Sequence, residues 1–349
     1  MKPTILALTQ GDPAGIGPEI LLKALAAAAA SGDRFSAPAS PTFLLIAERA
    51  ALDAVAALVP GFPWDRLVEV QSPDREALTR LAGQIALLDP VAHRRPVELG
   101  RSAAADARGA MAALDAAIGL ARDGVVDAIV TAPVSKESIA THCLPDFVGH
   151  TDYLAAACGL ERYGRDYLMA FLAPGMQVAL LTVHMPLRQA LDSIGRESVL
   201  EALACLDRHA GGRIALAGIN PHAGEGGLLG GEENEILVPT VAEARRRGID
   251  VHGPESADSL FARLARDEFD WVLALYHDQG LIAVKSAAFG LATNWTLGLP
   301  FLRTSVDHGT AFAIAGSGRA DAQPMSEVIA TTLKLLSGEL PRRGATRGA

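Results

Sequence analysis

The sequence predicts an α/β fold with a largely parallel sheet, because short apolar runs alternate with longer segments rich in Ala and Leu. Most of the apolar runs are nearly continuous, as is typical of strands that are buried on both faces. The strand and helix alternation favours parallel pairing. The predicted strands are Ile5–Thr9, Phe43–Ala47, Val125–Thr131, Tyr167–Leu172, Gln177–Val183, Ile214–Ile219 and Trp271–Tyr276. The predicted helices include Ala103–Arg122, Glu197–His209, Glu232–Arg247 and Ser256–Ala265.

One short turn predicts an exception to the parallel pattern. Ala173-Pro174-Gly175 separates two apolar runs and is typical of a hairpin, so we expect some antiparallel pairing. With 349 residues, half of them hydrophobic, the chain can bury a large core. Either one bilobed domain or two domains would fit this length.

Composition excludes several classes of partner. The net charge of −9 argues against nucleic acid and anionic membranes, although it leaves room for a local basic pocket. The longest apolar run, Ile20–Ala30, is too short to span a bilayer, and the N-terminal run is too short for a signal peptide. Cys143, Cys158 and Cys205 show no paired spacing, which fits a reducing compartment. We therefore expect a cytoplasmic protein.

A Gly-rich segment, Thr9–Glu19, follows the first predicted strand. Pro18 stands where a helix would begin, and a strand, a Gly-rich loop and a helix N-terminus together can cradle an anion or a cofactor. The spacing matches neither the dinucleotide-binding nor the P-loop pattern. A tight turn before a helix explains the segment equally well.

Three of the nine histidines lie just past the C-terminal ends of predicted strands. They are His184, His222 and His277. In open α/β sheets this edge is where ligands bind, and three imidazoles there would leave coordination positions free for a catalytic metal. A single histidine is more often structural than a ligand, and the long separations give no local metal signature. The shared position favours the metal site.

Further polar residues lie near these histidines. Asn220–Gly227 is dense in Gly, so its backbone amides can approach a ligand closely. In Gly149-His150-Thr151-Asp152, Thr151 is a candidate helix N-cap, and a simple capping turn would explain this group as well.

Two cations, Lys285 and Arg303, stand inside otherwise apolar stretches. A buried cation needs an anionic partner, and a substrate phosphate or carboxylate would serve. The competing interpretation is an internal ion pair, for example with Asp278 or Asp307.

Several longer motifs follow one another along the chain. They are Gly11-Asp12-Pro13-Ala14-Gly15-Ile16-Gly17-Pro18-Glu19, Gly149-His150-Thr151, Asn220-Pro221-His222-Ala223-Gly224-Glu225-Gly226, Tyr276-His277-Asp278-Gln279-Gly280, Thr296-Leu297-Gly298-Leu299-Pro300-Phe301 and Arg303-Thr304-Ser305-Val306-Asp307-His308-Gly309-Thr310. Together they resemble the motifs of the 4-hydroxythreonine-4-phosphate dehydrogenase family, in the family's order and over nearly the whole chain. One departure is Asp152, where many members have Glu.

The resemblance implies roles for individual residues. The family's metal-binding histidines match His184, His222 and His277. Its substrate-binding residues match His150, Thr151, Lys285, Asn294 and Arg303. No residue is identified as the general base.

The resemblance also implies an architecture similar to that of isocitrate and isopropylmalate dehydrogenases. Two α/β lobes would flank a cleft, with residues 1–133 and 305–349 in one lobe and 134–304 in the other. The family forms an obligate homodimer with active sites at the subunit interface. Two of the three histidines would come from one subunit and His277 from its partner.

The implied reaction is oxidation of 4-phosphooxy-L-threonine by NAD or NADP to 2-amino-3-oxo-4-phosphooxybutanoate. That product loses CO2 to give 3-amino-2-oxopropyl phosphate, on the route to pyridoxal phosphate. One divalent metal per subunit, held by three imidazoles, would lower the pKa of the substrate hydroxyl. Zinc suits three imidazoles best, whereas an open site that also takes substrate oxygens would accept magnesium, cobalt or manganese.

Three alternatives need many of the same residues. A dehydrogenase of the same family could act on phosphothreonate, phosphoerythronate or a cyclic diol carboxylate. A three-histidine metal hydrolase would need no dinucleotide, and a non-catalytic metabolite-binding protein would show no metal-dependent turnover. The run Leu6-Ala7-Leu8-Thr9-Gln10 and the set of motifs favour the biosynthetic dehydrogenase.

Overall fold

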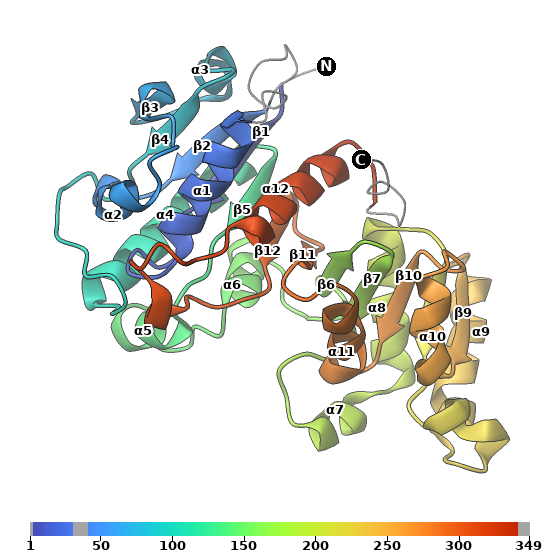
Figure 1. The fold of residues 1–349 in the computed structure, drawn as a ribbon. Helices are drawn as coiled ribbons and strands as arrows, with labels where there is room; N and C mark the ends of the chain where they lie inside the picture. Colours follow the sequence, from blue (N-terminus) through green and yellow to red (C-terminus); the bar gives the residue numbers. More distant parts are fainter. Residues whose placement is uncertain (1–2, 31–40, 341–349) are drawn as a thin grey trace. The chain divides into compact units, whose positions relative to one another are not determined.

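A computed structural model describes residues 3–30 and 41–340 of the chain (Figure 1). It divides them into two compact units. The first unit contains the described residues up to 157 together with 300–338, and the second contains residues 158–299. Both units are layered α/β structures, so the predicted fold class is confirmed.

The first unit contains a fully parallel sheet in the order β3-β4-β2-β1-β5-β12. Its strands are β1 (Ile5–Thr9), β2 (Thr42–Ile46), β3 (Leu67–Val70), β4 (Ile85–Leu88), β5 (Ala128–Thr131) and β12 (Leu302–Val306). Its helices are α1 (Gly17–Ala30), α2 (Arg49–Val55), α3 (Arg75–Arg80), α4 (Ala104–Arg122), α5 (Lys136–His142), α6 (His150–Ala157) and α12 (Gln323–Leu336). Helices α1 and α12 lie side by side and share one apolar core with the central strands (Figure 1).

The second unit contains a mixed sheet in the order β11-β6-β7-β10-β8-β9. Its strands are β6 (Leu168–Ala173), β7 (Met176–Leu180), β8 (Ile214–Ala217), β9 (Val251–Glu255), β10 (Trp271–Ala274) and β11 (Thr293–Leu297). Its helices are α7 (Leu187–Ser193), α8 (Arg196–His209), α9 (Val238–Arg246), α10 (Ala257–Leu264) and α11 (His277–Ala287). Helices α10 and α11 contribute side chains to one apolar core with the sheet.

The hairpin predicted at Ala173-Pro174-Gly175 is confirmed. Strands β6 and β7 pair antiparallel on either side of it, and Gly175 takes a left-handed φ of 71° that suits a glycine turn. By contrast, β7 and β10 are shorter than predicted. The apolar residues that follow these two strands lie outside the sheet, in the loops at the C-terminal ends of the strands. Among the described residues, no helix has the length and apolar content needed to cross a bilayer.

The Gly-rich turn after β1 is a packed structural turn. Residues 10–18 are all buried, and a Cβ on Gly11 would lie 2.2 Å from the carbonyl oxygen of Pro133. A Cβ on Gly17 would lie 2.1 Å from the carbonyl oxygen of Gln10. The glycines therefore let the turn pack against its neighbours, and the alternative of a tight turn before a helix is correct. The burial of residues 10–18 does not favour the other alternative, an open cradle for an anion or a cofactor.

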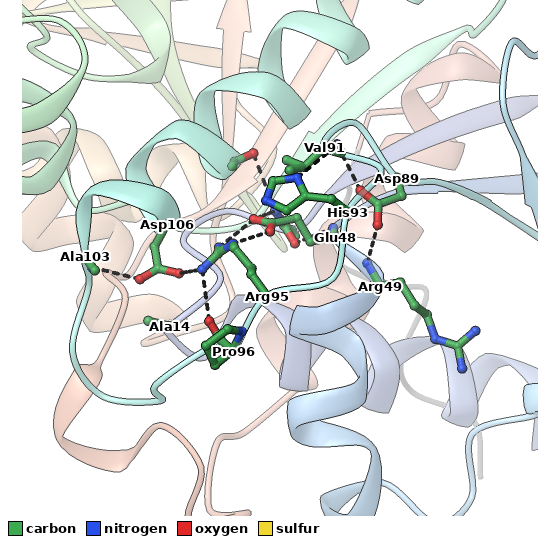
Figure 2. Close-up of polar contacts among 12 residues, drawn as sticks. Ala14, Glu48, Arg49, Asp89, Val91, His93, Arg95, Pro96, Ala103 and Asp106 are labelled. Atoms are coloured by element: carbon green, nitrogen blue, oxygen red, sulfur yellow. Dashed lines mark hydrogen bonds and ion pairs between the residues drawn. The ribbon is translucent and has the colours of Figure 1, made fainter.

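A buried ion network anchors the loop that follows β4 (Figure 2). The guanidinium of Arg95 makes two hydrogen bonds to the carboxylate of Glu48, at 2.6 and 2.8 Å, and lies 2.7 Å from Asp106. Glu48 in turn donates its backbone N–H to the side chain of Gln10 at 2.8 Å. A Cβ on Gly109 would overlap the Glu48 carboxylate, which explains a glycine in the middle of α4. The network ties four segments of the first unit together, which contain Gln10, Glu48, Arg95 and Asp106.

Asp12 lies beside this network and gives the first testable prediction. Burial raises the pKa of its carboxyl, so the folded chain keeps the proton to a higher pH than the unfolded chain does. The contribution of Asp12 to the free energy of unfolding therefore falls as the pH rises through the folded pKa. Asp12→Asn keeps the oxygen that accepts the Ala14 N–H at 3.0 Å and removes the charge. We expect the variant to gain stability over the wild type as the pH rises from about 3 to 7, measured by urea unfolding.

The exposed Asp146→Asn supplies the matched control for that series. The difference in free energy of unfolding between Asp146→Asn and the wild type should change little over the same pH range. If the difference in free energy of unfolding between Asp12→Asn and the wild type stays constant with pH, the raised pKa is not that of Asp12.

Candidate functional site

Three adjacent parallel strands of the second unit carry the candidate histidines. Strand β10 pairs with β7 on one side and with β8 on the other. His184 follows β7, His277 follows β10 and His222 follows β8. The carboxyl ends of parallel strands meet at one edge of a sheet, so all three loops start from the same edge of this unit.

His184 and His277 lie side by side. Their ring centroids are 5.4 Å apart, and both rings line a pocket of about 220 Å³. The other residues that line this pocket are Val183, Met185, Leu187, Ala190, Tyr276 and Asp278. The Asp278 carboxylate lies 2.7 Å from Nδ1 of His277. When Nδ1 carries the proton this contact leaves Nε2 as a metal-binding lone pair, an arrangement common around metal-bound histidines.

Two buried polar side chains tie these strand ends together. The Thr182 hydroxyl donates to the carbonyl oxygen of Leu275 at 2.9 Å, which joins the ends of β7 and β10. Gln279 accepts from the Leu275 N–H at 2.7 Å and donates to the carbonyl oxygen of Gly218 at 2.7 Å, which joins β10 to β8. The segments leading to the three histidines are thus fixed to one another at their base.

His222 lies on a different part of this edge from the other two histidines. It belongs to the turn η3 (Pro221–Gly227), and it lies near Asp258 of α10. Within residues 3–30 and 41–340, no three His, Cys, Asp or Glu side chains of one chain come close enough to hold a metal ion. A single chain therefore brings two of the three predicted ligands together and leaves the third apart.

The donor set nevertheless suits a divalent metal. Imidazole nitrogens bind zinc and its neighbours in the first transition row, and two of them already face a common pocket. The carboxylate on Nδ1 of His277 is the expected support for such a ligand. Completing the set requires the His222 loop to move or a second chain to contribute.

In the first unit, the structure builds an electropositive cluster around Arg303. This side chain is only 2% exposed and donates from Nη2 to the Thr131 hydroxyl at 2.7 Å. Burial lowers the pKa of Arg303 to about 9, so the guanidinium stays charged at neutral pH. Burial, helped by the charges of Arg303 and Lys136, holds the pKa of His150 well below its usual range. The cluster therefore presents a neutral imidazole beside two cations, which suits an anionic ligand.

The other predicted binding residues, Thr151, Lys285 and Asn294, lie in different surroundings, and some of these differ from the prediction. Thr151 is buried inside α6, which begins at His150, so the prediction that Thr151 caps this helix is wrong. Lys285 is exposed near the end of α11, so the buried cation that its apolar neighbours indicated is found at Arg303 and not at Lys285. Asn294 lies on β11, and its Oδ1 is buried without a hydrogen-bond partner in the described structure.

Sequence reasoning missed several residues of these two groups. Lys136 and Thr131 belong to the cluster around Arg303, and their signal was available: both lie at or just past the end of a predicted strand. The sequence indicated Asp278 only as a possible ion-pair partner of a cation. Its contact with the ring of His277, the residue directly before it, was missed. Gln279 lies in the motif Tyr276–Gly280, yet its link between two strands depends on sheet order, which the sequence does not show.

Comparison with known proteins agrees with this architecture. Residues 39–332 match the family model of the pyridoxal phosphate biosynthetic protein PdxA. The 4-hydroxythreonine-4-phosphate dehydrogenase of Acidithiobacillus ferrooxidans is 42% identical over 329 residues, which is 90% of this chain and 91% of that protein. The D-threonate 4-phosphate dehydrogenase of Salmonella typhimurium is 38% identical over 347 residues, 96% of this chain and all of that protein.

Among solved structures, the 4-hydroxythreonine-4-phosphate dehydrogenase of Klebsiella pneumoniae superimposes with a TM-score of 0.80 at 35% identity. The match covers 95% of this chain and 99% of that one. Fold and relatives together define the class of protein as a dehydrogenase. More narrowly, the chain belongs to the family of the pyridoxal phosphate biosynthetic protein PdxA.

Proposed function

We propose that this chain oxidises 4-phosphooxy-L-threonine with NAD or NADP to 2-amino-3-oxo-4-phosphooxybutanoate. The nicotinamide takes a hydride from C3, the hydroxyl proton leaves, and the 3-oxo acid then loses CO2 to give 3-amino-2-oxopropyl phosphate. The observation that carries the proposal is a histidine pair at a strand edge together with a buried anion-binding cluster, in a chain of this family. We place the reaction in the cytoplasm, and the free cysteines agree with a reducing compartment.

The cluster around Arg303 supplies the recognition of a substrate anion. A guanidinium offers paired donors that match phosphate or carboxylate oxygens, and burial strengthens each contact. The neutral His150 can donate or accept a hydrogen bond without adding charge. Thr151, Lys285 and Asn294 complete the substrate-binding set by resemblance to the family.

His184, His222 and His277 would hold the divalent metal, with zinc, magnesium and cobalt as candidates. A metal bound there would stabilise negative charge on the hydroxyl oxygen as C3 is oxidised. The chain itself orients the ligands. Asp278 holds His277 at 2.7 Å, and Thr182 fixes the end of β7 to β10.

A homodimer would complete this set of ligands. Among the described residues, the large apolar side chains that one chain leaves exposed belong to the second unit, apart from Leu144 and Val148. Those of the second unit are Met185, Leu187, Leu191, Leu228, Leu229, Val238, Ile282 and Phe289. Met185 and Leu187 line the pocket of His184 and His277, so apolar surface and metal ligands occur together. Exposed apolar surface of this kind is typical of a protein interface.

The substrate is tested with a panel of phosphorylated hydroxy acids, each offered with NAD and with NADP. We expect 4-phosphooxy-L-threonine to give the highest kcat/KM, read from the absorbance of the reduced cofactor. The D-threonate 4-phosphate dehydrogenase relative makes phosphothreonate the leading alternative. A higher kcat/KM for phosphothreonate would replace the proposed substrate and keep the dehydrogenase chemistry.

Lys285→Met tests the recognition of the substrate anion. The change removes the charge and keeps most of the aliphatic stem. Losing one charge-assisted contact should cost about 1.5–3 kcal/mol, or roughly a 10- to 150-fold fall in kcat/KM. Lys334→Met on α12 is the matched control and should leave kcat/KM unchanged. An unchanged kcat/KM for Lys285→Met would refute the assignment.

A further inference from the structure

The turn that carries His222 has an unusual backbone. Five successive residues, His222 to Gly226, have left-handed dihedral angles, with φ of 53°, 50°, 77°, 43° and 69°. L-residues other than glycine rarely take this conformation, and it normally occurs at single positions. His222, Ala223 and Glu225 are therefore strained, and such strain persists only where the surroundings enforce it.

One buried carboxylate provides that enforcement. Glu233 is 2% exposed and opens the π turn η4 (Glu233–Leu237). Its Oε1 accepts the backbone N–H groups of Ile219 at 2.8 Å and Asn220 at 2.7 Å. Its Oε2 accepts from the Asn220 side chain at 2.8 Å. Both oxygens thus hold the segment that enters the strained turn.

The fit on the other side of the carboxylate is equally close. A Cβ on Gly224 would lie 2.7 Å from Oε2 of Glu233. The left-handed turn therefore wraps around the carboxylate, with Asn220 on one side and Gly224 on the other. His222 lies between Asn220 and Gly224 in the chain. A shift of the Glu233 carboxylate would therefore displace the backbone on both sides of His222.

We propose that Glu233 is a positioning residue for His222: it fixes the strained turn in the conformation from which His222 would bind the metal in a site that a second chain completes. The inference rests on the proposed function, in which His222 is a ligand. Glu233 itself does not touch metal or substrate. Its contribution is to keep a ligand in a conformation that the backbone alone disfavours, as residues around metal ligands often do.

The test measures metal affinity on metal-free protein by competition with a fluorescent chelator, using zinc as the probe. Glu233→Ala removes three hydrogen bonds, and we expect zinc affinity to fall by about 10- to 100-fold. Glu233→Gln can keep an oxygen on the two backbone N–H groups but turns a donor toward the Asn220 amide. The zinc affinity of Glu233→Gln should fall by an intermediate amount, roughly three- to tenfold, so the conservative variant partly rescues binding.

Glu232→Gln is the matched control. Glu232 also accepts from the Asn220 side chain, at 2.7 Å, but it is exposed and touches neither backbone group. Its zinc affinity should stay within about twofold of the wild type. Hydrogen exchange of the metal-free protein adds an independent readout: the Ile219 and Asn220 amides should exchange faster in both Glu233 variants than in Glu232→Gln.

The outcomes separate the inference from the function on which it rests. Equal zinc affinity in the wild type and His222→Ala would overturn the ligand assignment and the inference with it. If His222→Ala loses zinc but both Glu233 variants bind it like the wild type, the positioning role alone is overturned. If Glu233→Ala does not fold, Glu233→Gln decides, and zinc affinity equal to that of Glu232→Gln overturns the proposal.

Discussion

His222→Ala should abolish most of the metal-dependent activity. We expect His222 to be a ligand because of its strand-edge position and its place in the family motif, although one chain holds it apart from the other two histidines. Loss of a residue that only supports a ligand typically costs 10- to 100-fold in affinity or activity, so loss of the ligand itself should exceed about 100-fold. Metal content of the purified variant should fall in parallel, because two imidazoles bind more weakly than three.

Metal content and turnover must be measured on the same preparation of His222→Ala. His142→Ala is the matched control, since His142 is exposed at the end of α5 in the first unit. It should retain both metal and activity. Retention of both by His222→Ala as well would show that the metal assignment is wrong.

Mixing His184→Ala with His277→Ala should restore activity that neither variant has alone. We expect each site to take His184 and His222 from one subunit and His277 from its partner, as the resemblance implies. A mixed dimer then contains one intact site and one site lacking two ligands. About half of the dimers are mixed, and each has one of two sites intact, so recovery should reach about one quarter of wild-type activity.

The alternative to a shared site is a metal site within one subunit. Because His184 and His277 of one chain lie with ring centroids 5.4 Å apart, they could also bind the same metal within a single subunit. In that case no mixed dimer has an intact site and activity stays at the level of the separate variants. Subunit exchange must be shown independently, for example by native mass spectrometry of tagged chains. Exchange without recovery would contradict the shared site.

The fold class and the apolar strands could be predicted because burial on both faces leaves a clear mark in the sequence. Strand β1 has the predicted bounds, Ile5–Thr9. Strands β3, β4, β9, β11 and β12 were missed. Polar residues such as Glu69, Asn294 and Arg303 interrupt the apolar pattern of β3, β11 and β12, and β9 contains Gly253-Pro254, whereas β4 is apolar but only four residues long. Two of these interruptions are candidate binding residues, so function obscured the pattern of the fold.

The candidate site could be predicted as a set of residues but not as a geometry. Strand ends pointed to His184, His222 and His277, because the end of an apolar run is visible in the sequence. The order β7-β10-β8, which makes their strands neighbours, depends on long-range pairing that no local pattern records. The same is true of Lys136 beside His150 and of Glu233 beneath the His222 turn, where residues distant in the chain meet only after folding.

The proposed reaction is a metal-dependent oxidation followed by loss of CO2. It is tested by stripping the purified protein of metal, adding 4-phosphooxy-L-threonine with NAD or NADP, and following reduced cofactor and released CO2 before and after adding back zinc, magnesium or cobalt. We expect no turnover in the stripped protein, and equal amounts of reduced cofactor and CO2 once a suitable metal is present. Undiminished turnover of the stripped protein, or no cofactor reduction with any of these metals, would contradict it.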